Sequence, residues 1–277
     1  MSKQSELEKL YELFPWIEDP ETPQGYERFK RTISDMEHLA THPWIKGVLG
    51  FKRTVKILDV CSGTGIGGVA FAKVLKTRGV DFELTMIDLR LSALEKAKKF
   101  SMRELSVEPE IIVTDVTGPI NLSEKFDLAL LWGSTTPHFN PWTWIRVLSN
   151  VSSILVDDGV FIYDEADRVR SIIMTRFNEI NPELVEEDKV VITVHGGRDA
   201  RTGNLKSILL DLASGKRVAY STYLWDIASS AAFTWVFFED VDFVPLRSQY
   251  SGVVIAYRPR RTIEPRTLHK TPRIISQ

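Results

Sequence analysis

The sequence predicts an α/β domain built on a mostly parallel, doubly wound sheet of seven strands, with a helical cap before it and an antiparallel β insertion within it. Two observations carry this prediction. Between residues 54 and 165, short apolar runs alternate with amphipathic helical segments, which is typical of βαβ units in a sheet covered on both faces. After residue 185, closely spaced strand-like runs are separated by turn residues instead. We therefore expect a cap over residues 1–50, a main domain over 51–258 with its insertion at about 186–225, and a basic tail over 259–277.

The cap is predicted to be helical from its apolar spacing. Leu7, Leu10 and Phe14 repeat at helical intervals, several prolines then interrupt the chain, and a second helical run covers about 26–39. His42-Pro43 is expected to end that run.

The main domain is predicted from continuous apolar runs bounded by turn residues. Its expected strands are 55–60, 82–87, 111–113, 126–132 and 160–163, and the helices between them are 69–77, 91–105 and 145–155. The expected strands of the insertion are 190–194, 205–212 and 217–224, after which a helix at 226–237 and strands at 243–247 and 252–257 return to the main sheet.

Composition excludes several classes of protein. The chain has 277 residues and a formal net charge of -2, which disfavours a globally basic nucleic-acid binder. A single cysteine, Cys61, excludes an intramolecular disulfide and a cysteine-rich zinc site, and no metal site is expected. The charged N-terminus and the lack of a long apolar segment predict a cytoplasmic protein that does not cross a membrane.

A glycine-rich turn follows the first strand of the main domain: Leu58-Asp59-Val60-Cys61-Ser62-Gly63-Thr64-Gly65-Ile66-Gly67-Gly68. Glycines let backbone N–H groups approach a ligand, and the N-terminus of the next helix favours negative charge. A nicotinamide dinucleotide would suit the same glycines. Asp59 favours another ligand, because an acid at the strand end suits the ammonium group of an amino acid and would repel a pyrophosphate.

Two further acids follow the next strands. Asp88 ends the second strand, where a carboxylate can accept hydrogen bonds from ribose hydroxyls. Asp115 follows the third strand and can accept a hydrogen bond from an adenine amino group, with Val116 against the ring. A helix N-cap for Asp88 and an Asx-turn for Asp115 are the structural alternatives.

These features, together with Phe126-Asp-Leu-Ala-Leu-Leu-Trp132-Gly133, resemble the class I S-adenosylmethionine-dependent methyltransferases, over about residues 54–165. The resemblance implies a Rossmann-like sheet with an antiparallel last strand. It implies that Asp59, Gly63 and Gly65 surround the methionine of S-adenosylmethionine. It also implies that Asp88 holds the ribose, while Leu89, Asp115 and Val116 contact the adenine. Further cofactor contacts are expected from the same turn and from the end of the fourth strand: Cys61, Thr64, Trp132 and Gly133.

A narrower resemblance lies at Gly133-Ser-Thr-Thr-Pro-His138-Phe, which is similar to a segment of small-molecule N-methyltransferases related to glycine N-methyltransferase, with Ser134 where that group has Asn. His138 lies at the carboxyl edge of the sheet and is the candidate base, with Tyr11 as a second candidate. The candidates for contact with the methyl acceptor are Trp16, Thr135, Phe139 and Trp142.

The predicted activity is methyl transfer to a nitrogen or oxygen of a small molecule. Three alternatives stay open. The basic tail favours an RNA or protein methyltransferase. The other two are a nicotinamide oxidoreductase and a non-catalytic nucleoside-binding subunit. The sequence also leaves a homodimer open.

Overall fold

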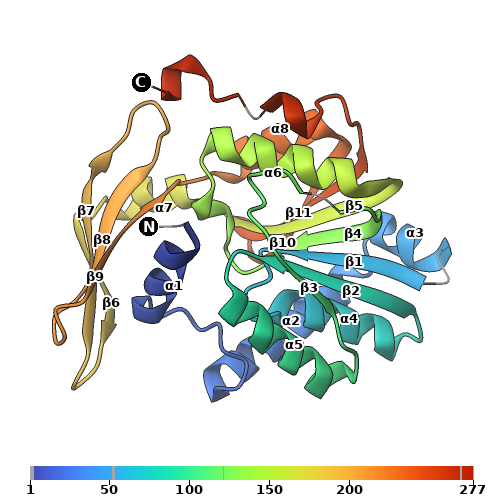
Figure 1. Ribbon diagram of the computed structural model, residues 1–277, viewed down its shortest axis with the longest axis horizontal. Coiled ribbons are helices and arrows are strands. Elements are labelled where there is room, and N and C mark those ends of the chain that lie inside the picture. The colour runs from blue at the N-terminus through green and yellow to red at the C-terminus, as the bar shows by residue number, and fades with distance from the viewer. Residues whose placement is uncertain (1–2, 52–53, 121, 269, 277) are drawn as a thin grey trace.

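The computed structural model describes residues 3–51, 54–120, 122–268 and 270–276, so the first two positions of the cap, three positions of the main domain and two positions of the tail lie outside the described residues. Its centre is a seven-stranded sheet of order β10-β11-β5-β4-β1-β2-β3 (Figure 1). The strands of this sheet are β1 (Thr54–Val60), β2 (Asp81–Asp88), β3 (Glu110–Val113), β4 (Phe126–Leu131), β5 (Leu155–Ala166), β10 (Phe238–Ser248) and β11 (Ser251–Pro259). Neighbours among β1 to β5 pair in parallel, whereas β11 runs antiparallel to β5 and β10. This arrangement confirms the predicted fold class.

Helices cover both faces of the sheet (Figure 1). One face carries α2 (Pro23–Leu39), α3 (Pro43–Phe51), α4 (Ile66–Thr77) and α5 (Leu91–Leu105), and the other carries α6 (Pro141–Ile154) and α8 (Ile227–Phe237). Alternate side chains of β4 serve the two layers: Leu128 and Leu130 pack in the first, Ala129 and Leu131 in the second. The continuous apolar strands are therefore explained by burial on both faces.

A second, four-stranded antiparallel sheet of order β6-β7-β8-β9 stands beside the main body. Its strands are β6 (Ile180–Val185), β7 (Val190–Arg198), β8 (Leu205–Asp211) and β9 (Arg217–Thr222), and α7 (Arg168–Thr175) leads into it. The first helix, α1 (Lys3–Leu13), lies between this sheet and the main one (Figure 1). Leu10 and Leu13 of α1 are buried against Leu209 and Val218 of the inserted sheet. The opposite side of α1 is thereby turned toward the main sheet.

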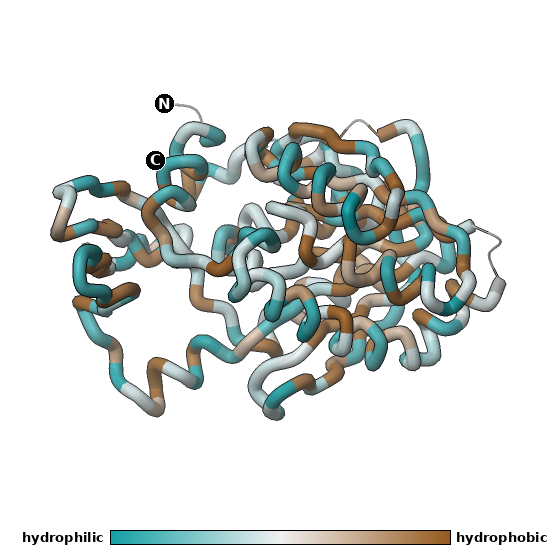
Figure 2. The backbone as a smooth tube through the Cα atoms, turned by 90° about the horizontal axis from the view of Figure 1, so that it is seen from below, coloured by the Kyte–Doolittle hydropathy of each residue, from teal (hydrophilic) through white to brown (hydrophobic). Residues whose placement is uncertain are grey.

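Three elements differ from expectation. The second helix ends at Leu39, before His42-Pro43, as expected, but Pro43 also begins a third helix, α3, because proline suits the first turn of a helix, where its missing N–H has no helical partner. The inserted sheet begins at Ile180 rather than near 186, and α7 precedes it. Residues 157–159, which fall between the expected helix at 145–155 and the expected strand at 160–163, lie within β5 at an irregularity in its pairing with β4. Figure 2 shows the apolar stretches spread through the larger body, with the inserted sheet projecting at one side.

The described part of the tail packs on the main domain. Ser149 of α6 donates a hydrogen bond to the carbonyl of Ile263 at 2.8 Å, and Arg261 forms an ion pair with Asp157 at 2.5 Å. Among the described residues, no helix combines the length and the apolar character needed to cross a bilayer.

Candidate active site

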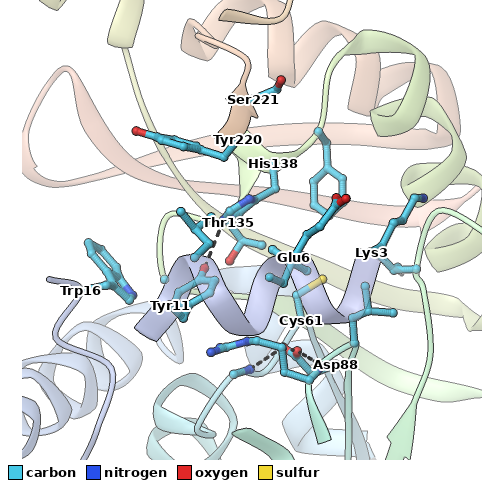
Figure 3. A pocket seen from close by; sticks show the side chains of 18 of the residues that line it. Lys3, Glu6, Tyr11, Trp16, Cys61, Asp88, Thr135, His138, Tyr220 and Ser221 are labelled. Carbon is cyan, nitrogen blue, oxygen red and sulfur yellow. Dashed lines mark hydrogen bonds and ion pairs between the residues drawn. The ribbon is translucent and has the colours of Figure 1, made fainter. Parts of the chain in front are cut away.

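A cavity of about 800 Å³ opens at the carboxyl edge of the main sheet, with α1 and the inserted sheet forming its other walls (Figure 3). The volume lies within the range of small-molecule sites. The predicted site residues that line it are Tyr11, Trp16, Cys61, Gly63, Thr64, Asp88, Leu89, Asp115, Val116, Trp132, Gly133, Thr135, His138 and Phe139. Asp59, Gly65 and Trp142 are not among the residues of this wall.

The glycine turn forms the floor of the cavity between β1 and α4. Gly63 has a φ of 53° and Gly65 a φ of 83°, in the left-handed region where glycine is favoured. At Gly65, a Cβ would lie 2.9 Å from that of Ala97, so this glycine allows α4 and α5 to pack closely. Gly67 has a similar role, since its Cβ would lie 2.6 Å from that of Trp132. Gly65 thus serves the packing of these two helices, and its expected contact with the cofactor stays a prediction.

Asp59 lies behind the turn. Its Oδ2 accepts a hydrogen bond from the N–H of Gly68 at 2.8 Å, and its Oδ1 is buried without a partner among the described residues. Burial, with a smaller contribution from Asp88, raises the pKa of Asp59 to about 8. Asp59 thus lies one layer behind the cavity wall, from which it orients the turn. Its unpartnered Oδ1 fits a site that receives a hydrogen-bond donor, so the expected contact with an ammonium group stays a prediction.

Asp88 lies at the end of β2, at the cavity wall. Its Oδ2 accepts the N–H of Gly63 and its Oδ1 accepts the N–H of Arg90, each at 2.8 Å. Burial raises the pKa of this carboxyl, and the neighbouring Arg90 opposes that effect. Each carboxylate oxygen has a second lone pair, so Asp88 can hold the turn and still accept hydrogen bonds from a ligand. Leu89 lies beside it on the same wall.

Asp115 lines the cavity and also forms the Asx-turn that was the structural alternative. Its Oδ1 accepts the N–H of Thr117 at 2.9 Å and the hydroxyl of Thr117 at 2.6 Å. Its Oδ2 forms an ion pair with Lys3 of α1 at 2.8 Å, and that lysine lowers the pKa of Asp115 together with Thr117. A ligand amino group at Asp115 would therefore meet Lys3 at the same oxygen.

The loop that follows β4 is fixed by hydrogen bonds to an acidic residue of the neighbouring strand, β5. Asp164 of β5 accepts the N–H of Gly133 at 2.9 Å and the N–H of Ser134 at 2.8 Å. This contact fixes the loop that carries Thr135 and His138. Nothing in the sequence pattern shows that Asp164 reaches across to β4, so this contact was not predicted.

His138 and Tyr11 meet inside the cavity (Figure 3). The Nε2 atom of His138 and the hydroxyl oxygen of Tyr11 lie 3.1 Å apart and share a hydrogen bond. The ring of His138 is reached from the cavity but is enclosed by protein, and this desolvation, with Arg90 and Arg168 nearby, lowers its pKa to about 4. Burial raises the pKa of Tyr11 to about 12. Both groups are therefore neutral near pH 7.

A cluster missed at the sequence level joins the cap to the site. The buried Arg90 forms two hydrogen bonds with Glu18, of 2.9 and 2.8 Å, and its guanidinium lies 3.8 Å from the ring centre of Tyr11. Arg28 of α2 stacks on Trp16 at 4.6 Å and lines the cavity. Among the described residues, Arg28 has no carboxylate within ion-pair distance, so it presents a partly buried positive charge.

The inserted sheet forms one wall of the cavity with mostly polar groups, one of which is charged. Its residues are Gly196, Asn204, Lys206, Ser207, Ile208, Ala219, Tyr220 and Ser221, and Asn140 and Thr143 of the main domain line the same cavity. Glu6 of α1 also lines this end and forms no ion pair with a described residue (Figure 3). Phe139 lines the cavity as predicted, stacked on Trp144 with ring centres 5.9 Å apart. Trp142 was wrongly placed here, because its indole N–H donates to the carbonyl of Arg201, 3.0 Å away.

Comparison with known proteins agrees with this geometry. A protein-family profile described as "Methyltransferase domain" matches residues 57–159, and no curated protein matches the sequence. The PH0226 protein from Pyrococcus horikoshii is similar in structure, with a TM-score of 0.64 at 20% identity, over 91% of this chain and 99% of that chain.

Two further solved structures are similar at lower scores. CalS10 from Micromonospora echinaspora, an amino pentose methyltransferase with S-adenosylmethionine bound, has a TM-score of 0.53 at 19% identity over 86% of this chain and 98% of its own. The sugar N-methyltransferase KedS8 from a Streptoalloteichus species has a TM-score of 0.53 at 15% identity over 85% and 93%. Residues 57–159 thus match a methyltransferase domain, the fold is that of solved methyltransferases, and the chain is an enzyme that uses S-adenosylmethionine as its cofactor.

Proposed function

We propose that this methyltransferase transfers the methyl group to a nitrogen or oxygen of a small polar molecule, with an amine as the leading candidate. The observation that supports it most is the polar end of the cavity, where α1 and the inserted sheet leave room for a small acceptor beside the cofactor. The similarity to amino pentose and sugar N-methyltransferases favours an amino sugar among the amines. The similarity to glycine N-methyltransferase-type enzymes at Gly133–Phe139 stays a prediction.

The proposed cofactor contacts follow the wall of the cavity. Asp88 would accept the ribose hydroxyls, Val116 would pack on the adenine, and Gly63 would offer the close backbone approach that the methionine needs. Arg28, which has no carboxylate within ion-pair distance in the described part of the chain, would hold the methionine carboxylate. The bound cofactor would supply an electrophilic methyl group on a positively charged sulfur.

The residues at the acceptor end suit an amine that reacts with its lone pair free. Glu6 would attract the protonated amine from solution into the cavity, and the amine would release its proton to water before the methyl transfer. With a pKa of about 4, His138 is a weak base, so its proposed task is to accept a hydrogen bond from the neutral amine and aim the lone pair at the methyl group. Tyr11 fixes the ring of His138 through the 3.1 Å contact.

The test compares acceptors of matched shape. The enzyme is incubated with S-adenosylmethionine and pairs of sugars that differ only in an amino or a hydroxyl group, and products are read by mass spectrometry. We expect methylation of the amino member, slowed in His138→Ala while the affinity for S-adenosylhomocysteine is kept. Methylation of RNA or protein with every small acceptor inert would contradict the proposal.

A matched variant tests the role of Glu6. Glu6→Gln should raise the KM for an amine acceptor with little change in kcat, because it removes attraction of the free substrate. The control is Glu12→Gln on the same helix, since Glu12 does not line the cavity and pairs with Lys216 at 2.7 Å. An equal KM in both variants would reject the assignment.

A further inference from the structure

A second cavity, of about 490 Å³, adjoins the first at the carboxyl end of β5. Trp16, Arg28, Trp132 and Gly133 line both cavities and form the wall between them. Its other walls come from α2, from the end of β5 and the start of α7, and from the hairpin of β10 and β11. It therefore lies on the far side of the expected methionine end of the cofactor, away from the inserted sheet.

Four arginines from three parts of the chain converge on this second cavity: Arg28 and Arg31 of α2, Arg168 at the start of α7, and Arg247 of β10. Guanidinium groups that approach from several directions suit an anion with several oxygen atoms, because each can donate two parallel N–H groups. A carboxylate or a phosphate has such oxygens, and a phosphate presents them in three dimensions.

The acids of the same wall are already engaged. Asp164 accepts two backbone N–H groups, Glu165 is paired with Arg168, and Asp35 is paired with Arg247 at 2.7 Å. Arg28 and Arg31 have no carboxylate within ion-pair distance among the described residues. The second cavity thus has positive charge in excess, and Arg31 is available to a ligand even if Arg28 holds the cofactor.

We propose that the second cavity is an anion subsite that binds a phosphate or diphosphate group beside the cofactor. The group belongs either to the methyl acceptor or to a separate small molecule, and the chemistry of recognition is the same in both cases. This subsite does not depend on which atom is methylated, so it can fail while the proposed function stands.

The test is calorimetric titration of pyrophosphate into the full chain saturated with S-adenosylhomocysteine, so that the first cavity is filled. We expect saturable binding that Arg31→Gln weakens by about tenfold or more, the usual effect of losing a hydrogen bond to a charged group. Arg247→Gln should also weaken it. Arg266→Gln, which changes an exposed arginine of the tail outside both cavities, is the control and should bind normally.

Three results would overturn the proposal: no saturable binding of pyrophosphate, equal binding in Arg31→Gln and Arg266→Gln, or loss of binding when S-adenosylhomocysteine is present. Loss of binding in the presence of S-adenosylhomocysteine would mean that pyrophosphate binds only where the carboxylate of the cofactor binds. Competition between pyrophosphate and an active acceptor would assign the phosphate to the acceptor, and binding without competition would assign it to a separate ligand. Thermal unfolding of each variant checks that it is folded.

Discussion

Replacing Asp88 by asparagine tests the proposed contact between this side chain and the ribose of the cofactor. The carboxylate accepts the N–H groups of Gly63 and Arg90 at 2.8 Å each and faces the cavity. Asparagine has nearly the same shape, but one oxygen becomes an NH₂ group that cannot accept. One charge-assisted hydrogen bond to the ribose is then lost, which is worth about 1.5–3 kcal/mol. The Kd for S-adenosylhomocysteine should rise by about 10- to 150-fold.

The assay is calorimetric titration of S-adenosylhomocysteine into wild type and variant. Asp81→Asn is the control, because it makes the same change at the exposed start of the same strand, β2. The free energy of unfolding of Asp88→Asn should also fall by about 1–3 kcal/mol, since a backbone N–H loses its acceptor. A Kd equal to that of wild type would refute the assignment of the ribose to Asp88.

Three further outcomes are expected. Gly67→Ala should lower the free energy of unfolding by about 1–3 kcal/mol, because the added Cβ would lie 2.6 Å from the Cβ of Trp132. Gly47→Ala in α3 is the control: no atom lies within 4 Å of its added Cβ, so the better helix former should raise the free energy of unfolding slightly. Equal melting temperatures of the two variants would contradict this. Arg28→Gln should weaken S-adenosylmethionine about tenfold or more and leave decarboxylated S-adenosylmethionine unaffected, in competition binding; equal losses would reject the carboxylate contact. The folded-state pKa of His138, about 4, lies below its usual 6.5, so the unfolded chain binds more protons in that window. Wild type should therefore lose more stability than His138→Gln between pH 6.5 and 4 in denaturant titrations; parallel losses would show that the ring titrates normally.

The main sheet could be predicted because its signal is local. Continuous apolar runs such as β4 need burial on both faces, and the glycines around residue 65 permit a turn that few other residues allow. Asp88 could be placed for the same reason, since a strand end fixes where its side chain emerges. These features depend on neighbours in the chain and hardly on distant contacts.

The rest depends on distant contacts. Arg28 reaches the site because α2 crosses the sheet, and Arg90 meets Glu18 only because the cap folds back onto β2. The periodicity of apolar residues predicts neither of these two contacts. Trp142 was misplaced for the same reason, since only the hairpin of the inserted sheet, through Arg201, decides which way its ring turns.

Asp59 shows the limit in another form. A strand residue one place before the end was expected to reach the ligand, but the turn of Gly63 and Gly65 carries the backbone over it. Its carboxyl then bonds to Gly68 beneath the turn. The presence of an acid at this position thus pointed to the site, but the sequence did not show that Asp59 lies one layer behind the cavity wall.

The most direct test is a crystal structure of the enzyme with S-adenosylhomocysteine. The ribose hydroxyls should lie on Asp88, the amino-acid carboxylate on Arg28, and the sulfur should face His138 across the space left for the acceptor. A nucleoside bound outside this cavity, or bound with its ribose away from Asp88, would contradict the proposed site.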